Sequence, residues 1–187
     1  MYPPIIASIG WVGGRSLFKV QGIIELWRML MSAIKFTSIP TSEAAGYWNG
    51  GLDAYGKLPE RHISDGSGIP CRHCQQDVAK EDIYLILAHC PFPNLHAYAE
   101  TGPIFLHVQA CQRYPEIAKT PDMFLKRDRF LLKGYSKDDR IVYGTGQIVQ
   151  SAEVDEKAAD ILTRDDVSYV HVRSALNNCF SCRIDRV

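Results

Sequence analysis

The sequence lacks a long apolar segment, and it lacks an excess of charge of either sign. No stretch approaches the roughly 18 apolar residues that a membrane-spanning helix needs. The 21 basic residues balance the 21 acidic residues, so no overall field attracts nucleic acid or an anionic membrane surface. We therefore expect neither partner. The sequence leaves open which small molecule or protein the chain binds, and it leaves the oligomeric state open.

The start of the chain lacks the features of a secretory signal peptide. It has no positively charged first segment, and Arg15, Lys19, Glu25 and Arg28 interrupt the apolar residues around them. This absence predicts a cytoplasmic protein, and thiols in the cytosol normally stay reduced. The six cysteines are therefore expected as thiols or metal ligands rather than as disulfides.

The length and composition are those of one ordinary folded domain. A chain of 187 residues with 46% apolar and 22% charged residues can bury a core of normal size without disulfide or metal support. We predict that residues 31–187 form a single domain, since Met31 opens a segment typical of a domain start. Residues 1–30 are interpreted as an N-terminal extension, helical or disordered. The apolar spacing of residues 17–30 leaves a docking helix for a partner as the alternative.

Hydrophobic patterning predicts an α+β fold, a mainly antiparallel sheet with a few short helices. The predicted strands are residues 33–39, 83–89, 102–108, 130–135, 140–149, 167–173 and 179–186. Two hairpins are expected, one formed by the fourth and fifth of these strands and the other by the last two.

The remaining segments predict two helices and one long loop. A helix is expected to begin near Thr41, with a hydroxyl cap, and another at Ser151. Residues 49–70 are dense in Gly, Pro, Asp and Asn, which predicts a long surface loop. Residues 83–89 are apolar at consecutive positions, which favours a central strand covered on both faces.

Several short strings in this chain are similar to those of a known family. They are Asp53-Ala-Tyr-Gly56, Pro59-Glu-Arg61, Ser64-Asp-Gly66, Pro70-Cys-Arg-His-Cys74, Tyr98-Ala-Glu-Thr-Gly-Pro-Ile-Phe105, Arg140-Ile-Val-Tyr-Gly-Thr-Gly146, His171-Val-Arg-Ser-Ala175 and Asn178-Cys-Phe-Ser-Cys-Arg-Ile184. From about residue 31 to its end, the chain resembles the bacterial proteins grouped as domain of unknown function 1203. The resemblance implies a small bacterial domain without an established activity, so it supplies no catalytic residue.

Cys71 and Cys74 are separated by Arg72 and His73, and this spacing has three interpretations. A turn of this kind brings two sulfurs within reach of one zinc ion, which takes four ligands. The same turn can hold a redox-active dithiol whose thiolate is stabilised by a neighbouring cation. A thioredoxin-like site, however, needs a helix at the motif, and residues 75–80 leave room for about one turn. The third interpretation is a plain turn with two structural cysteines.

The further candidate zinc ligands are Cys179, His107 and Cys111. Cys179 and Cys182 form a second pair with the same spacing, but residues three apart on a strand point to opposite faces. Cys179, beside the predicted turn, is the better candidate, and Cys182 is assigned to the core. His107 ends a predicted strand, and the turn behind it would let Cys111 approach the first cysteine pair. Zinc is thus the one cofactor that the sequence suggests, in a structural or ligand-binding role.

A module that binds a small anion or a partner without metal is a further hypothesis. Its candidate residues are Arg61, His62, Arg72, His73, His171 and Arg173. Tyr169, His171 and Arg173 alternate along one predicted strand, and the Arg173 guanidinium offers a fork for an anionic group. The simpler interpretation of this stripe is the solvent-exposed face of an antiparallel sheet.

The sequence lacks the common catalytic motifs. It has no Gly-x-Ser-x-Gly elbow, no phosphate-binding loop and no His-Glu-x-x-His helix. Gly144-Thr-Gly146 lacks the third glycine of a dinucleotide fingerprint and fits a bulge or a close backbone contact better. Whether the chain is an enzyme therefore stays open, and the zinc hypothesis leads.

Overall fold

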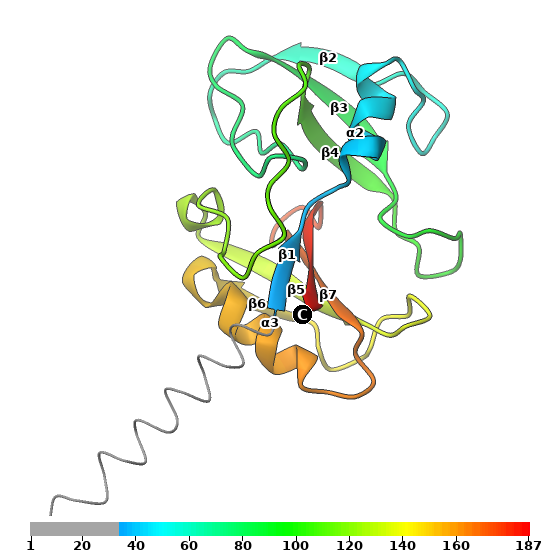
Figure 1. The fold of residues 1–187 in the computed structure, drawn as a ribbon, viewed down its shortest axis with the longest axis vertical. Coiled ribbons are helices and arrows are strands. Elements are labelled where there is room, and N and C mark those ends of the chain that lie inside the picture. Colours follow the sequence, from blue (N-terminus) through cyan, green and yellow to red (C-terminus); the bar gives the residue numbers. More distant parts are fainter. Residues whose placement is uncertain (1–33) are drawn as a thin grey trace, which may run out of the picture.

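The computed structural model describes residues 34–187, which form an α+β protein built mainly from antiparallel strands (Figure 1). The strands are β1 Ile34–Thr37, β2 Glu60–Ile63, β3 Ile83–His89, β4 Gly102–His107, β5 Arg129–Tyr135, β6 Gln147–Gln150, β7 Tyr169–Ser174 and β8 Phe180–Arg186. The helices are α2 Thr41–Trp48 and α3 Val154–Leu162, with the short 3-10 turns η1 Phe124–Lys126 and η2 Ser151–Glu153. The predicted fold class is confirmed. The extension predicted for residues 1–30 lies outside the described residues.

The strands form two sheets. The larger sheet has the order β1-β8-β7-β5-β6, and the smaller has the order β2-β3-β4. All strand pairs within them are antiparallel, and both predicted hairpins are present, β5 with β6 and β7 with β8. Figure 1 shows the smaller sheet with α2 at one end of the described part and the larger sheet with α3 at the other. Within this part, neither helix has the length and hydrophobicity needed to span a membrane.

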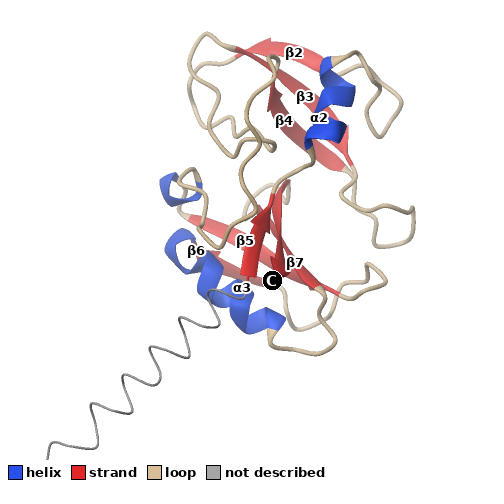
Figure 2. Cartoon of the chain, viewed as in Figure 1, coloured by secondary structure: helices blue, strands red, loops and turns tan. Residues whose placement is uncertain are grey.

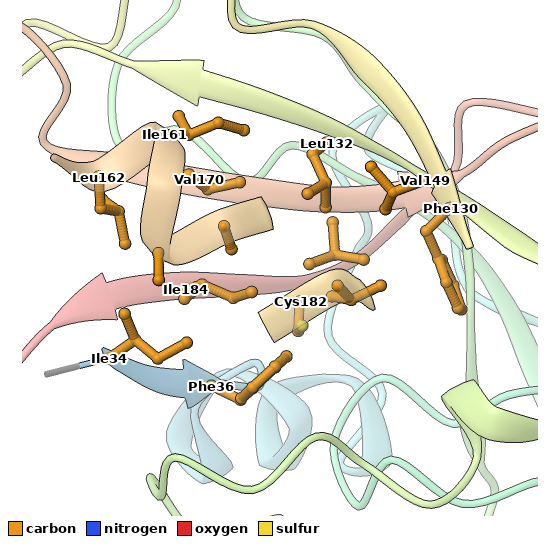
Figure 3. Packing of buried hydrophobic residues seen from close by; sticks show 14 of the residues in the cluster. Ile34, Phe36, Phe130, Leu132, Val149, Ile161, Leu162, Val170, Cys182 and Ile184 are labelled. Carbon is orange, nitrogen blue, oxygen red and sulfur yellow. The ribbon is translucent and has the colours of Figure 1, made fainter. Parts of the chain in front are cut away.

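The main core lies between α3 and one face of the larger sheet. The apolar side of α3 supplies Val154, Ala158, Ile161 and Leu162, all of which are buried. The facing strands contribute alternate side chains, among them Leu132 and Ile184, which are fully buried (Figure 3). This alternation follows from the period of two along a strand. Cys182 is also fully buried in this core.

A second core lies beneath the smaller sheet. It contains the buried Leu85, Leu87, Ile104 and Leu106 of β3 and β4 together with Ala44 of α2. Figure 2 shows α2 beside these strands. The prediction that β3 is covered on both faces is wrong, because the alternate side chains Tyr84, Ile86 and Ala88, on the face opposite Leu85 and Leu87, are only half-buried. The strand is central in its sheet, but only one face of that sheet meets a core.

The predicted long loop at residues 49–70 contains a strand that the sequence did not indicate. β2 pairs with β3 along its whole length, yet all four of its side chains are exposed. Backbone hydrogen bonds and the contact between the His62 and Tyr84 rings hold this edge strand, so it carries no hydrophobic pattern. The predicted strand 140–149 likewise begins only at Gln147, after a turn in which Gly144 has a left-handed φ of 83°.

Candidate metal site

The turn at Cys71–Cys74 lies against β4, the strand that carries His107. Cys71 forms a bridge with Phe105, and the Arg72 amide donates to the Phe105 carbonyl over 2.9 Å. The turn closes through hydrogen bonds between Cys71 and the residues after the motif, and Gln75 takes a left-handed φ of 56°. The buried Gln75 amide donates to the carbonyl of Ser181 on β8. Both sheets therefore contribute to the position of the two cysteines.

Four donor atoms from two segments converge at this turn. The ligand atoms of Cys71, Cys74, His107 and Cys111 all lie within 4.8 Å of one another. The two sulfurs of Cys71 and Cys111 are 3.9 Å apart, and the Cys74 sulfur is 3.5 Å from Nδ1 of His107. Four atoms placed tetrahedrally at zinc distances of about 2.0–2.3 Å would be about 3.3–3.8 Å apart. The distances of 3.9 Å and 3.5 Å lie close to this range, and the widest separation, of up to 4.8 Å, would have to shorten by about 1 Å around one ion.

His73 and Trp48 hold the cluster from outside. Nδ1 of His73 is 3.2 Å from the Cys111 sulfur, and its Nε2 is 2.9 Å from the Thr41 hydroxyl. Burial lowers the pKa of His73, so its ring is neutral. If the hydroxyl donates to Nε2, Nδ1–H is left to donate to the sulfur. Trp48 donates from Nε1 to the His107 carbonyl over 2.8 Å.

The metal-free cluster favours one thiolate and one imidazolium. Hydrogen bonds from Cys111 and Cys74 lower the pKa of Cys71. Hydrogen bonds with the Cys71 and Cys74 sulfurs raise the pKa of His107 to about 10. The hydrogen bond between Cys111 and Cys71 is the main cause that raises the pKa of the Cys111 thiol to about 12. A thiolate among several sulfurs is the form in which cysteine binds metal.

Cys179, the remaining candidate ligand, lies outside this group of four. The C-terminal hairpin does reach the turn, but through backbone atoms, because Arg72 donates from Nε to the Phe180 carbonyl. The half-buried thiol of Cys179 lies 3.6 Å from the carbonyl of Asn177 instead. The hairpin therefore holds the turn in place through hydrogen bonds but contributes no sulfur to the cluster.

The candidate anion-binding residues lie in three places rather than one. Arg61 and His62 are exposed on β2, where His62 is 3.0 Å from the Glu60 carboxylate. Arg72 and His73 are buried in the cysteine turn. His171 and Arg173 lie on β7.

The β7 stripe is not a solvent-exposed face, so that simpler interpretation is wrong. Tyr169, His171 and Arg173 are each at most 3% exposed, because the segment between β3 and β4 covers them. The Phe92 ring lies 5.3 Å from the His171 ring, and Glu100 forms an ion pair of 3.0 Å with Arg173.

Sequence reasoning missed the side chains that surround these groups. A hydroxyl cap was expected at the start of α2, but α2 has no side-chain cap, and the Thr41 hydroxyl contacts His73 instead. Glu43 lies 2.9 Å from Nδ1 of the buried His89, which no motif singled out. The spacing of Glu43 on a short helix and His89 at a strand end carries no local signal, so only the packing of α2 on β3 reveals the pair.

Comparison with known proteins gives one result. The family model described as "Protein of unknown function (DUF1203)" matches residues 68–186, more than half of the chain. The matched range contains all four residues of the cluster, whereas the similar strings before residue 68 lie outside it. Neither the search of curated proteins nor the search of solved structures found a match. The family match shows that the chain belongs to the DUF1203 family of proteins of unknown function.

Proposed function

We propose that Cys71, Cys74, His107 and Cys111 bind one zinc ion and that this ion is structural. The observation that carries the proposal is the approach of three sulfurs and one imidazole nitrogen to within 4.8 Å. Three cysteines and one histidine are one of the usual ligand sets of structural zinc. Sulfur ligands also disfavour calcium and magnesium, which prefer oxygen.

The charge around the cluster supports a bound ion. Zinc with three thiolates and a neutral imidazole carries one net negative charge. Arg72, between the two cysteines of the turn, is 3% exposed, and within residues 34–187 it forms no ion pair with a carboxylate. Burial lowers the pKa of Arg72 to about 10, so the guanidinium stays charged at neutral pH. A buried cation without an opposite charge is costly, and a zinc–thiolate centre would supply that charge.

A structural role follows from the closed ligand set. A catalytic zinc keeps one position open for water or substrate, whereas here the protein offers four ligands. Cys71 and Cys74 are also buried. The ion would join the turn before β3 to the end of β4, two segments that also meet through a backbone bridge and a shared apolar cluster. We infer a zinc-stabilised domain whose binding surface lies elsewhere.

Elemental analysis of the purified full chain tests this proposal, with two cysteine variants for comparison. Cys111→Ser removes one ligand, whereas Cys90→Ser removes another half-buried thiol that lies outside the cluster. We expect about one zinc per chain in the wild type and in Cys90→Ser, and much less in Cys111→Ser. Removal of zinc by a chelator should lower the unfolding temperature of the wild type and of Cys90→Ser, because metal binding is coupled to folding.

Two results would contradict the proposal. One is a folded wild-type protein that contains no metal after purification in zinc-supplemented medium. The other is equal zinc content in Cys111→Ser and the wild type. A disulfide between cysteines of the cluster in the metal-free protein would favour the redox interpretation instead.

A further inference from the structure

A cavity with a volume of ≈ 370 Å³ lies beside the cysteine turn, and the zinc site does not use it. Four segments form its wall: the start of the turn, β4, the residues from Met123 to Phe130, and the turn of the β7–β8 hairpin. None of the four proposed zinc ligands lines it. Binding sites for small molecules typically have volumes of about 300–1,000 Å³, so this cavity is large enough for a ligand.

Arg72 supplies one free hydrogen-bond donor to the cavity. The side chain is 3% exposed, and two of its nitrogens are used, because Nε donates to the Phe180 carbonyl and Nη1 donates to the Pro70 carbonyl. Nη2 makes no hydrogen bond with residues 34–187, yet it is not one of the fully enclosed polar atoms without a partner, so it keeps some accessible surface. Because Arg72 lines this cavity, Nη2–H is the donor that a ligand there would meet.

The charges around the cavity leave a positive excess. The charged side chains of the lining, together with their ion-pair partners, are Arg72, Lys126, Arg127, Arg129, Asp77 and Asp128. Asp77 pairs with Arg127 and, over 3.9 Å, with Lys126, whereas Asp128 pairs with Arg129 over 3.2 Å. Four cations thus share two carboxylates. The proposed zinc centre would add one negative charge, and one positive charge would still be unbalanced, so the cavity favours an anion.

The rest of the wall is largely apolar. Phe105, Met123, Phe130 and Leu176 line the cavity. The guanidinium carbon of Arg72 lies 5.7 Å from the centroid of the Phe105 ring, so the free donor and an aromatic ring are neighbours. Leu176, on the hairpin turn, is 85% exposed, and a ligand would cover part of its apolar surface. These features select a molecule that combines a negative group with an apolar ring.

We propose that this cavity binds a small aromatic carboxylate. The carboxylate accepts from Nη2–H of Arg72, and the ring packs on the apolar wall beside Phe105. Hydrogen bonds between ionised groups are about twice as strong as neutral ones. An engineered protein cavity of about 150 Å³ holds benzene, so a cavity more than twice as large can hold the same ring with a three-carbon acid, as in 3-phenylpropionate. The proposal does not depend on the zinc ion, because the charge excess is positive with or without it.

An NMR titration of the nitrogen-15-labelled full chain with 3-phenylpropionate tests this proposal. We expect saturable shifts of the backbone amides of Ala175 and Leu176, which line the cavity, and no shift of the Asp160 amide on α3, which does not. 3-Phenylpropionamide lacks the charge and propionate lacks the ring. Each should therefore need an about tenfold higher concentration for a half-maximal shift.

Three variants locate the contact. Arg72→Gln removes Nη2 and the charge, and it should raise the half-maximal concentration of 3-phenylpropionate about tenfold. Arg164→Gln, at a guanidinium that pairs with Asp166 and does not line the cavity, should leave that concentration unchanged. If Arg72→Gln does not fold, Ala175→Phe takes its place. The larger side chain, at a half-buried position of the hairpin turn, would occupy the cavity and should also weaken binding about tenfold.

The proposal would be overturned if 3-phenylpropionate at about 10 mM caused no saturable shift, because this concentration fills most of a site with a Kd near 1 mM. Equal half-maximal concentrations for the acid, its amide and propionate would also overturn it, as would wild-type affinity in Ala175→Phe. Zinc content is measured on the same samples. A wild-type protein that contains zinc but does not bind the acid would contradict this proposal alone, and one that binds the acid without zinc would contradict the metal site alone.

Discussion

Nδ1 of His107 lies 3.5 Å from the sulfur of Cys74, although the two residues are 33 positions apart in the chain. The contact exists because the cysteine turn bridges to Phe105 on β4, two residues before His107. The same approach places Cys111, just past the strand end, 3.9 Å from the Cys71 sulfur. One backbone bridge thus assembles three sulfurs and an imidazole, and several predictions can be tested from this arrangement.

The contact between His73 and Cys111 predicts a role in metal affinity. His73→Phe keeps a ring for the edge contact with Trp48, at 5.2 Å, but removes the nitrogen that lies 3.2 Å from the Cys111 sulfur. Groups that hydrogen-bond to metal ligands typically contribute about 10–100-fold to affinity. We expect a loss of this size in competition with a chromophoric chelator. His62→Phe, on the exposed strand β2, is the matched control, and equal affinities for the two variants would count against the contact.

The core between α3 and the larger sheet predicts that two substitutions on neighbouring strands differ strongly in their effect on the free energy of unfolding. Leu132 on β5 is fully buried, whereas Ile148 on β6 is 58% exposed. Leu132→Ala should lower the free energy of unfolding by about 2–5 kcal/mol, because it leaves a cavity. Ile148→Ala should cost less than about 1 kcal/mol. Denaturant unfolding of both variants, with zinc present throughout, measures the difference. Similar costs would mean that the two side chains are not on opposite faces of the sheet.

The burial of His171 predicts acid sensitivity. Burial, followed by the charge of Arg173, lowers the pKa of His171 well below its ordinary value. The unfolded chain therefore takes up a proton below about pH 6.5 that the folded chain does not, so stability is lost as the pH falls. Between about pH 7.5 and about pH 5.5, this one group should cost about 1.4 kcal/mol of unfolding free energy.

His171→Asn isolates that contribution. The variant still unfolds with all other titrating groups, so the difference between its stability profile and that of the wild type reports His171. We expect the difference in free energy of unfolding between the wild type and His171→Asn to decrease by about 1.4 kcal/mol as the pH falls across this range. A constant difference at every pH would show that the His171 pKa is the same in the folded and unfolded chains.

Parts of this fold could be predicted because their patterns are local. The two hairpins follow from alternating apolar residues on either side of polar turns. The strand β2 could not be predicted, because Glu60–Ile63 has four exposed side chains and is held mainly by backbone pairing with β3. The burial of the β7 face that carries His171 and Arg173 could not be predicted from the local sequence either. His171 and Arg173 are covered by Phe92 and Glu100 from a distant loop.

The candidate metal site was only partly accessible from sequence for a similar reason. The spacing of Cys71 and Cys74 is a local signal, and so is the position of His107 at a strand end. Which further residues converge on the pair depends on the bridge between the turn and β4, which no spacing reveals. Cys179 resembled an equally good ligand, but its hairpin meets the turn through the Phe180 carbonyl rather than through sulfur.

The most direct test of the central claim is X-ray absorption at the zinc edge, measured on the purified wild-type protein. A centre formed by Cys71, Cys74, Cys111 and His107 predicts three sulfur neighbours at about 2.3 Å and one nitrogen neighbour at about 2.0–2.1 Å. A zinc ion surrounded mainly by oxygen and nitrogen, or a folded protein without zinc, would contradict it.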